Sequence, residues 1–444
     1  IGLRIKRVSA GQGRWSSSAG EYSKFGLNPM ELMEALEIAK SKNILDCVKL
    51  IHFHLGSQIT NIRRIKNSLK EVGRFYSELM RFGCNIEYID VGGGLGIDYD
   101  GSRSTFASST NYSVQEYAND VVYHLLEICK SENLPHPNII SESGRAMTAH
   151  HSILVFNVLD VTSFPEWSDE INVPEDTPEA VKEIFNVLNS TSNKNLIESW
   201  HDAVHLKEEA QSKFLLGLIS LTDRALIERI YWGICRKIEK ISSRLKFLPD
   251  DISNLRTRLA DKYFCNFSVF QSVPDSWAID QVFPVVPLHR LNEEPDRDAT
   301  LADITCDSDG RIDNFIGTNR GTENTLRVHS LKENESYALC IFLTGAYQEI
   351  LGDLHNLFGA TNPVHVSLKE GGTINYEQII EGEDVADVLD YVQFSADELA
   401  GRIDGFLIGC VQRGVVTQQE ADDFLDLYKE GLNGYTYLVK PDAD

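Results

Sequence analysis

The stretch Asp90-Val91-Gly92-Gly93-Gly94-Leu95-Gly96 is the part of this sequence that decides the fold. It follows a strand-like segment at residues 85–90. Three consecutive glycines after a strand let backbone N–H groups approach an anion, because no Cβ stands in the way. The same glycines also suit a tight turn from a strand into a helix, so the run by itself leaves both interpretations open.

Residues 1–164 alternate strand-like segments with helical patterns. Strands are expected at residues 3–8, 48–54, 86–91 and 138–142, and helices at 29–42, 62–82 and 114–131. A repeated β-then-α order predicts parallel strands, and in the barrel version of such folds the site residues lie where strands end. We therefore expect an α/β fold whose first part is the C-terminal half of a (β/α)8, TIM-like barrel. The chain has no initiator methionine and opens on a strand, so we expect the start of the barrel to be missing from it.

The remainder of the chain divides into three predicted parts, which makes the fold class α/β plus β. Residues 165–262 are expected to form an inserted helical bundle, with a linker at 169–178 and helices at 178–188, 196–215 and 220–245. Residues 263–383 form the predicted β-domain, with strands at 264–270, 302–306 and 337–342. Residues 384–444 form a helical extension, with helices at 396–413 and 418–431.

Composition and charge restrict the class of protein. The chain has 444 residues, of which 42% are hydrophobic, enough for a large core. Its net charge of −24 argues against nucleic acid and anionic membranes as partners. The eight cysteines are scattered and form no CxxC pair, which indicates free thiols in a reducing, cytoplasmic setting. We find no run of about 18 apolar residues, so no membrane span is expected.

Two motifs near the predicted strand ends suit a phosphorylated aromatic cofactor. His54 offers a flat ring for stacking and Ser57 can donate to a phosphate, although a core histidine is the alternative. Glu142 can hold a protonated ring nitrogen and Arg145 a phosphate, although a structural ion pair is the alternative. A charged hydrogen bond of about 1.5–3 kcal/mol would keep such a ring nitrogen protonated, and so keep the ring an electron sink.

Two further motifs lie in the predicted β-domain. Cys306 can hand a proton to a carbanion and Asp307 can hold a cationic group, although a buried cysteine beside a turn explains the same residues. Tyr347, after Gly345-Ala346, can offer its hydroxyl to a phosphate, although core packing is the alternative. Together the motifs favour an enzyme that uses a phosphorylated cofactor.

In this combination and order, the motifs resemble those of the fold-type III, pyridoxal-phosphate-dependent decarboxylases, in particular their biosynthetic arginine decarboxylase branch. The resemblance covers essentially the whole chain. It rests on residues 23–26, 53–58, 90–98, 142–151, 266–272, 274–277, 279–281, 303–310, 345–352 and 434–438. Serine at position 143, where the commoner relatives have proline, and the helical insertion both favour the arginine branch.

The resemblance implies roles for individual residues. The implied cofactor contacts are Arg4, His54, Ser57, Gly92, Gly93, Gly94, Glu142, Gly144, Arg145 and Tyr347. The implied substrate contacts are Tyr88, Ile89, Asp90, Val91, Gly92, Gly93, Gly94, Leu95, Gly96, Ile97, Asp98 and Asp307. The implied catalytic residues are Cys306, Asp307, His54 and Glu142. In this family Cys306 and Asp307 would reach the active site of a partner subunit.

The activity implied by the resemblance is decarboxylation of L-arginine to agmatine and carbon dioxide, on pyridoxal 5'-phosphate, in polyamine (putrescine and spermidine) biosynthesis. A homodimer or homotetramer is implied, and relatives in the branch also require magnesium, for which the sequence shows no ligand set. The family's Schiff-base lysine has no counterpart here; Lys24 belongs to another motif, and we expect this chain alone to be inactive.

Two alternative functions stay open. One is a sister decarboxylase that acts on diaminopimelate, ornithine or lysine, against which the helical insertion and the Glu-Ser-Gly-Arg form speak. The other is a non-catalytic, regulatory homologue; the absent lysine favours it, whereas the retained Cys306 and Glu142 speak against it.

Overall fold

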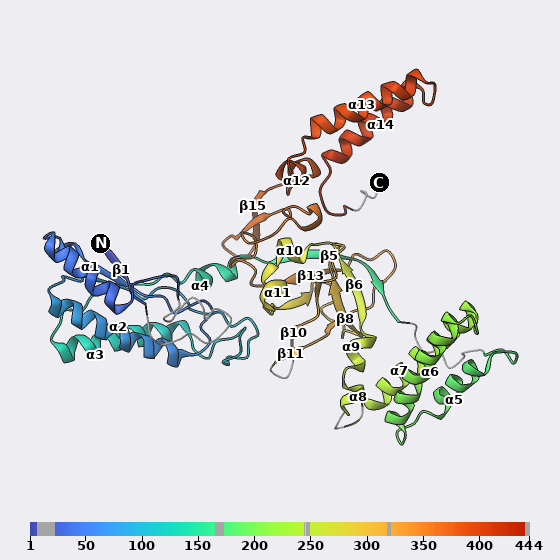
Figure 1. Ribbon diagram of the computed structural model, residues 1–444, viewed down its shortest axis with the longest axis horizontal. Coiled ribbons are helices and arrows are strands. Elements are labelled where there is room, and N and C mark those ends of the chain that lie inside the picture. The colour runs from blue at the N-terminus through green and yellow to red at the C-terminus, as the bar shows by residue number, and fades with distance from the viewer. Residues whose placement is uncertain (7–22, 165–172, 244, 246–248, 318–320, 440–444) are drawn as a thin grey trace.

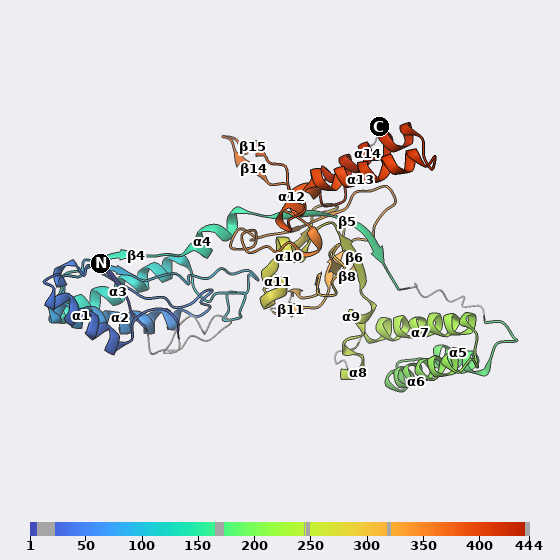
Figure 2. The ribbon, with the colours of Figure 1, turned by 45° about the horizontal axis from the view of Figure 1, so that its top comes forward.

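The structure is a computed structural model that describes residues 1–6, 23–164, 173–243, 245, 249–317 and 321–439. Figure 1 shows four parts along an elongated molecule: the first helices and strands (blue) and a helical bundle (green) lie at opposite ends, with a β-sheet part between them. A helical pair (red) projects from the β-sheet part, and the turned view of Figure 2 agrees. Three separate clusters of buried apolar side chains serve the first part, the sheet part and the bundle.

The first part is a parallel four-stranded sheet in the order β1-β2-β3-β4. Its strands are β1 (Gly2–Arg4), β2 (Leu50–His52), β3 (Tyr88–Asp90) and β4 (Asn138–Ile140). The register aligns Arg4 with His52, His52 with Asp90 and Asp90 with Ile140. The carboxyl ends of the four strands therefore meet at one edge, as the β-then-α pattern predicts.

A helix follows each of the first three strands, and these helices contribute buried apolar side chains to the core of the first part. They are α1 (Pro29–Ser41), α2 (Ile62–Phe82) and α3 (Val114–Glu132), with a short α4 (Gly144–Thr148) after β4. Side-chain caps from Asn28, Asn61 and Ser113 satisfy N–H groups at their N-termini. The partial α/β barrel predicted from the sequence is confirmed, and the predicted bounds of α2 coincide with the observed ones. Residues 7 and 8 of the first predicted strand lie outside the described residues.

The central part is a seven-stranded sheet whose path runs β12-β8-β6-β5-β13-β7, with β9 beside β8. Its strands are β5 (Leu154–Thr162), β6 (Asp261–Cys265), β7 (Val285–Pro287), β8 (Arg297–Ala302), β9 (Arg311–Ile312), β12 (Leu326–Val328) and β13 (Ala338–Ile341). Two separate ribbons are β10 (Phe315–Ile316) with β11 (Thr322–Glu323), and β14 (Val364–Leu368) with β15 (Ile374–Ile379). Because β5 pairs with both β6 and β13, a strand within residues 1–164 belongs to this second sheet.

Two predicted strands of this part are wrong. The strand predicted at 264–270 is instead the end of β6, and Ser268 then caps a helical turn, α10 (Val269–Ser272). Of the strand predicted at 302–306, only Ala302 belongs to a strand, as the last residue of β8. The rest is a turn, in which the carboxylate of Asp303 accepts the N–H of Thr305 at 2.9 Å and that of Val269 at 2.8 Å. The strand predicted at 337–342 contains β13 and is confirmed.

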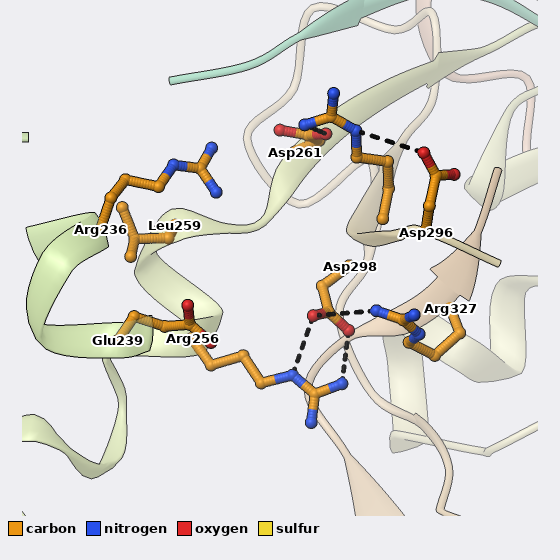
Figure 3. A pocket seen from close by; sticks show the side chains of 9 residues that line it. Arg236, Glu239, Arg256, Leu259, Asp261, Asp296, Asp298 and Arg327 are labelled. Atoms are coloured by element: carbon orange, nitrogen blue, oxygen red, sulfur yellow. Dashed lines mark hydrogen bonds and ion pairs between the residues drawn. The ribbon is translucent and has the colours of Figure 1, made fainter. Parts of the chain in front are cut away.

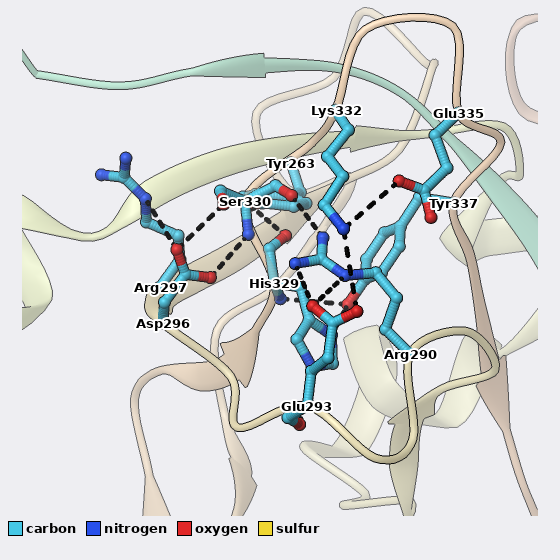
Figure 4. Close-up of polar contacts among 10 residues, drawn as sticks. All are labelled: Tyr263, Arg290, Glu293, Asp296, Arg297, His329, Ser330, Lys332, Glu335 and Tyr337. Carbon is cyan, nitrogen blue, oxygen red and sulfur yellow. Dashed lines mark hydrogen bonds and ion pairs between the residues drawn. The ribbon is translucent and has the colours of Figure 1, made fainter.

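A buried polar network ties the loops of the central sheet together (Figure 4). His329 is 2% exposed, and its Nδ1 lies 2.9 Å from the hydroxyl of Tyr337. The same hydroxyl accepts the backbone N–H of His329, while Tyr263 donates its hydroxyl to the carbonyl of His329. Each buried polar atom named here has a partner, so the network costs little by desolvation and fixes one loop arrangement.

The remaining elements are mainly helical. The bundle contains α5 (Glu179–Ser190), α6 (Leu196–Leu215), α7 (Leu221–Ser242), α8 (Asp250–Ser253) and α9 (Leu255–Leu259). The tail contains α12 (Val385–Tyr391), α13 (Ala396–Gln412) and α14 (Gln418–Leu432), and shorter elements are α11 (Pro274–Ile279), η2 (Leu45–Cys47), η3 (Ala149–His151) and η4 (His355–Leu357). Residues 169–172 of the predicted linker and residue 244 of the predicted third bundle helix lie outside the described residues. Within the described part of the chain, no helix combines the length and apolarity needed to cross a bilayer.

Candidate active site

Charged side chains gather at the edge where the four parallel strands end. Arg4 and Asp90 occupy the last positions of β1 and β3, and Glu142 follows β4 by two residues. The backbone N–H of Glu142 donates to the carbonyl of Gly92 at 2.9 Å, which joins the loops after β3 and β4. Burial lowers the pKa of Arg4, although the nearby carboxylates of Glu142 and Asp90 oppose that shift. A cation on the first strand thus faces two acids on the third and fourth.

His52 lies between these acids. Its Nε2 is 3.7 Å from a carboxylate oxygen of Glu142, is itself buried, and has no hydrogen-bond partner among the described residues. Ligand-type atoms of His52, Asp90 and Glu142 all lie within 4.8 Å of one another. This trio has the chemistry of a metal site, but a metal ion there would compete for Glu142 with any other group that this carboxylate holds.

The glycine run brings three loops into close backbone contact. Gly92 has φ +67°, and a Cβ added to it would lie 2.2 Å from the carbonyl oxygen of Phe53. Its N–H donates to the Asp90 carboxylate at 2.8 Å, and the N–H of Gly93 donates to His54 Nδ1 at 3.2 Å. The glycines therefore make a tight turn, and the N–H groups of Gly92 and Gly93 already have partners in the protein, which favours the turn interpretation; their contact with a cofactor stays a prediction.

His54 is held as a neutral ring beside this turn. Burial lowers its pKa, and electrostatic interaction with the neighbouring Arg4 and His52 lowers it further, against an opposing effect of Glu142. Since Nδ1 accepts the N–H of Gly93, the neutral tautomer carries its proton on Nε2. An uncharged imidazole at a strand end presents a flat face on which an aromatic ring can stack.

A second cluster, which we call the anion cradle, consists of Ser57, Gly144, Arg145 and Tyr347. Arg145 is 5% exposed, and its guanidinium lies 3.3 Å from Ser57 Oγ and 5.0 Å from the centre of the Tyr347 ring. The neutral hydroxyl of Tyr99 is its other hydrogen-bond partner, at 2.8 Å. Within the described part of the chain no carboxylate pairs with Arg145, so a buried cation has only neutral partners.

Space is available beside that cation. A Cβ added to Gly144 would meet a single atom within 4 Å, the Tyr347 hydroxyl at 4.0 Å. Tyr347 itself has φ +71°, a left-handed conformation that is costly for a non-glycine residue and is often found at functional sites. A buried, uncompensated guanidinium next to open space and hydroxyl donors is suited to an anion.

Cys306 and Asp307 lie elsewhere, on the loop between β8 and β9 of the central sheet. Both are exposed, and among the described residues neither contacts the strand-end residues of the first part. The N–H of Cys306 donates to Asn356 at 3.2 Å, and Asp307 lies 3.6 Å from His355. One copy of the chain therefore keeps these two residues apart from the other predicted site residues.

The predicted substrate segment contributes mainly backbone. The side chains of Ile89, Val91, Leu95 and Ile97 are buried in the hydrophobic clusters. Asp98 accepts the hydroxyl of Ser109 at 2.6 Å. Tyr88, 39% exposed, is the one large side chain of this stretch that stays open to solvent.

Sequence reasoning missed three contributors to these clusters. Tyr99 holds Arg145 from a loop that has no recognisable motif, and His355 and Asn356 reach the Cys306 loop from about 50 residues away in sequence. His52 belongs to no motif of its own, but its alternation with His54 along one strand predicts that both lie on the same face and gives His52 a supporting role. That alternation was the available signal for His52; nothing in the sequence marks the other three.

Comparisons with known proteins agree with this arrangement. Residues 1–149 match the family "Pyridoxal-dependent decarboxylase, pyridoxal binding domain". Residues 174–256 match "Arginine decarboxylase helical bundle domain", and residues 385–438 match "Arginine decarboxylase C-terminal helical extension". The match to the first description covers the strand ends and the cradle residues Ser57, Gly144 and Arg145.

Individual relatives extend over nearly the whole chain. A biosynthetic arginine decarboxylase from Bacteroides thetaiotaomicron is 54% identical, over 99% of this chain and 69% of that protein. One from Phocaeicola vulgatus is 51% identical over the same shares. The solved biosynthetic arginine decarboxylase of Campylobacter jejuni has a TM-score of 0.82 and 33% identity, over 99% of this chain and 69% of that one. A diaminopimelate decarboxylase from Helicobacter pylori shares the fold, with a TM-score of 0.52 at 14% identity over 88% of this chain and 66% of that one.

Proposed function

This chain belongs to the arginine decarboxylase family of pyridoxal-dependent decarboxylases, and from that premise we propose that protein expressed from its complete reading frame converts L-arginine to agmatine and carbon dioxide. Pyridoxal phosphate is the cofactor that the family description and the residues support. The helical bundle and C-terminal extension, whose matches carry the arginine decarboxylase name, favour arginine over the sister substrates diaminopimelate, ornithine and lysine. Agmatine formed in this way would supply putrescine and spermidine synthesis.

The observation that carries the proposal is the anion cradle. Arg145 is buried beside neutral hydroxyls and open space, so folding has desolvated a cation without giving it a counter-charge. Such a group is costly until an anion arrives. The phosphate of pyridoxal phosphate would supply that anion, with Ser57 and Tyr347 as further donors.

The strand-end acids fit the other end of the same cofactor. When bound, pyridoxal phosphate accepts the electron pair left behind as carbon dioxide departs, provided its ring nitrogen stays protonated. Glu142 would accept that N–H and hold the positive charge. Arg4 and His52 would orient Glu142, and the neutral ring of His54 would stack on the cofactor without adding a competing charge.

The final proton transfer is the task proposed for the Cys306 loop. Asp307 would hold the cationic end of the substrate and Cys306 would deliver a proton to the carbon that has lost its carboxylate. Since both residues are exposed and remote from the strand ends of their own chain, we propose that two copies associate and each completes the other's site. Such a complex would be at least a dimer, as a homodimer or a homotetramer. We assign no magnesium ligands.

All eight cysteines are free in the structure, which supports a reducing compartment such as the cytoplasm as the place of action.

The division of the chain into four domains, with boundaries after residues 164, 262 and 383, stays a prediction.

A substrate panel tests the proposed function. Protein expressed from its complete reading frame would be mixed with pyridoxal phosphate and, separately, with L-arginine, L-ornithine, L-lysine or meso-diaminopimelate. We expect amine and carbon dioxide from arginine, at a rate at least tenfold above any other substrate. A preference for another substrate would reject the arginine assignment, and cofactor binding with no turnover of any of them would favour the non-catalytic alternative.

A further inference from the structure

A small polar cavity lies at the joint between the helical bundle and the central sheet, and none of the residues that line it belongs to the proposed active site (Figure 3). Its volume is about 240 Å³. Side chains from α7, α9 and strands β6, β8 and β12 surround it, so both parts of the molecule contribute walls. The residues that line it most directly include four arginines and four acids, so its charge is balanced overall.

Most of these charges are already used within the protein. Asp298 is held by Arg256, whose Nε lies 3.0 Å away, and by Arg327 at 3.5 Å. Asp296 accepts the N–H and the hydroxyl of Ser330, at 2.8 and 2.9 Å. These pairs form one side of the cavity and need no ligand.

Two buried side-chain atoms of the lining, one acceptor and one donor, have no hydrogen-bond partner among the described residues. Asp261 is 3% exposed, and its Oδ1 has no hydrogen-bond partner among the described residues; its other oxygen lies only within 3.9 Å of Arg297. On the bundle side, the Nε of Arg236 is buried and likewise has no partner in the described part of the chain, although its Nη2 donates to the carbonyl of Phe164. A buried polar atom without a partner destabilises the folded protein, so one unmet acceptor and one unmet donor that line a common cavity are unusual.

From this we infer a ligand site for a small zwitterion, a molecule with one carboxylate and one amino or guanidino group. The carboxylate would accept hydrogen bonds from Arg236, and the cationic group would donate to Asp261. A simple anion would leave Asp261 unsatisfied, and a simple cation would leave Arg236 unsatisfied, so the pair selects a molecule with both charges. The cavity has room for a compact amino acid, since water in the liquid occupies about 30 Å³ per molecule and the space equals several waters.

The position of the site gives the ligand a structural effect. Arg236 belongs to α7 of the bundle and Asp261 to β6 of the sheet. A zwitterion bound to both would bridge the two parts and stabilise the folded protein by an amount that rises with the logarithm of its concentration above the dissociation constant. The inference does not depend on the proposed decarboxylase activity, because none of these residues lies at the strand ends of the first part.

Calorimetric titration of the protein tests the site directly. The probes are three zwitterions of increasing charge separation, namely glycine, 4-aminobutanoate and 6-aminohexanoate, with butanoate and butylammonium as single-charge controls. We expect one zwitterion to bind at least tenfold more tightly than either control, and to raise the melting temperature. Arg236→Met and Asp261→Asn should each weaken that binding at least tenfold, whereas the matched surface variants Arg311→Met and Asp313→Asn should not.

Asp261→Asn keeps the shape of the side chain and removes a buried charge, so it should fold even if Arg236→Met does not; circular dichroism checks both. The inference is overturned if no zwitterion binds at millimolar concentration, if a single-charge control binds as tightly as the best zwitterion, or if the folded Asp261→Asn protein binds as the unaltered protein does. The first of these outcomes would mean that ordered water satisfies Asp261 and Arg236.

Discussion

Replacing Arg145 with methionine should separate cofactor binding from stability. Two charge-assisted hydrogen bonds from Arg145 to a phosphate are worth about 1.5–3 kcal/mol each, a total of about 3–6 kcal/mol. Since about 1.4 kcal/mol is a factor of ten, the affinity for pyridoxal phosphate should fall by about 100-fold or more. Methionine fills a similar space, and the variant loses a buried cation along with two hydroxyl contacts, so the free energy of unfolding without cofactor should change by less than about 2 kcal/mol.

The assay compares two forms of the cofactor. Equilibrium dialysis would measure the dissociation constants of pyridoxal phosphate and of pyridoxal, which has no phosphate, for the unaltered protein and for Arg145→Met. We expect the variant to lose affinity for pyridoxal phosphate alone, so that its preference for the phosphorylated form disappears. Arg81→Met, which removes an exposed ion-paired arginine on α2, is the control and should change neither constant. Equal losses for both cofactor forms, or a retained preference for phosphate, would refute the role of the anion cradle.

Four other changes should have distinct outcomes. Glu142→Gln should slow turnover at least tenfold while weakening cofactor binding less, because a neutral amide cannot hold the ring nitrogen's charge in the transition state. Cys306→Ala should lower agmatine formation by about 10²–10⁴-fold, since general acid catalysis typically contributes that much. It should also raise the ratio of aldehyde product to agmatine, because without the thiol the proton can reach the cofactor instead of the substrate carbon. The pKa of His54 is lowered from its ordinary value of 6.5 in the folded protein, so just below pH 6.5 the unfolded chain binds more protons than the folded protein. The free energy of unfolding should therefore fall as the pH falls below 6.5, and His54→Gln should remove this contribution to its pH dependence. Tyr337→Phe leaves two buried groups of His329 without a partner and should lower the free energy of unfolding by about 1–3 kcal/mol.

Each of these expectations has a contrary result. Unchanged turnover in Glu142→Gln, measured with saturating cofactor, would show that Glu142 has no role in the chemical step. A less stable Cys306→Ala protein that makes only agmatine at a near-normal rate would make this cysteine structural. A His54→Gln protein whose urea-unfolding free energy has the same pH slope as the unaltered protein would contradict the neutral-ring assignment. A calorimetric melting temperature unchanged by Tyr337→Phe would show that water replaces the lost hydroxyl.

Periodicity predicted the regular elements of the first part and of the bundle well. Helix α2 has apolar residues at helical spacing and an asparagine cap, and local signals of this kind decide where such a helix begins and ends. The prediction of a strand at 264–270 is wrong because its apolar residues serve two different elements, and because the distant Asp303 holds the N–H of Val269, the first residue of the helical turn. Helix α12 was missed for a related reason: it is short, and its first residue is fixed by the Asp384 capping box.

In the candidate site too, contacts set by regular strands could be predicted, whereas contacts made by distant loops could not. Arg4, Asp90 and Glu142 could be expected to meet, because parallel strands place their carboxyl ends together. The partners of Arg145 could not, since Tyr99 and Tyr347 arrive from loops that no periodicity describes. The separation of Cys306 from the strand ends is a property of the whole fold, and only the resemblance to known decarboxylases raised the need for a second copy of the chain.

The most direct test of the central claim is release of labelled carbon dioxide from carboxyl-labelled L-arginine by protein expressed from its complete reading frame, with pyridoxal phosphate supplied or removed. The account predicts one agmatine for each carbon dioxide released, and activity that is lost when the cofactor is removed and restored when it is returned. Carbon dioxide release that persists without pyridoxal phosphate, or a folded and cofactor-loaded protein that releases none from arginine, would contradict it.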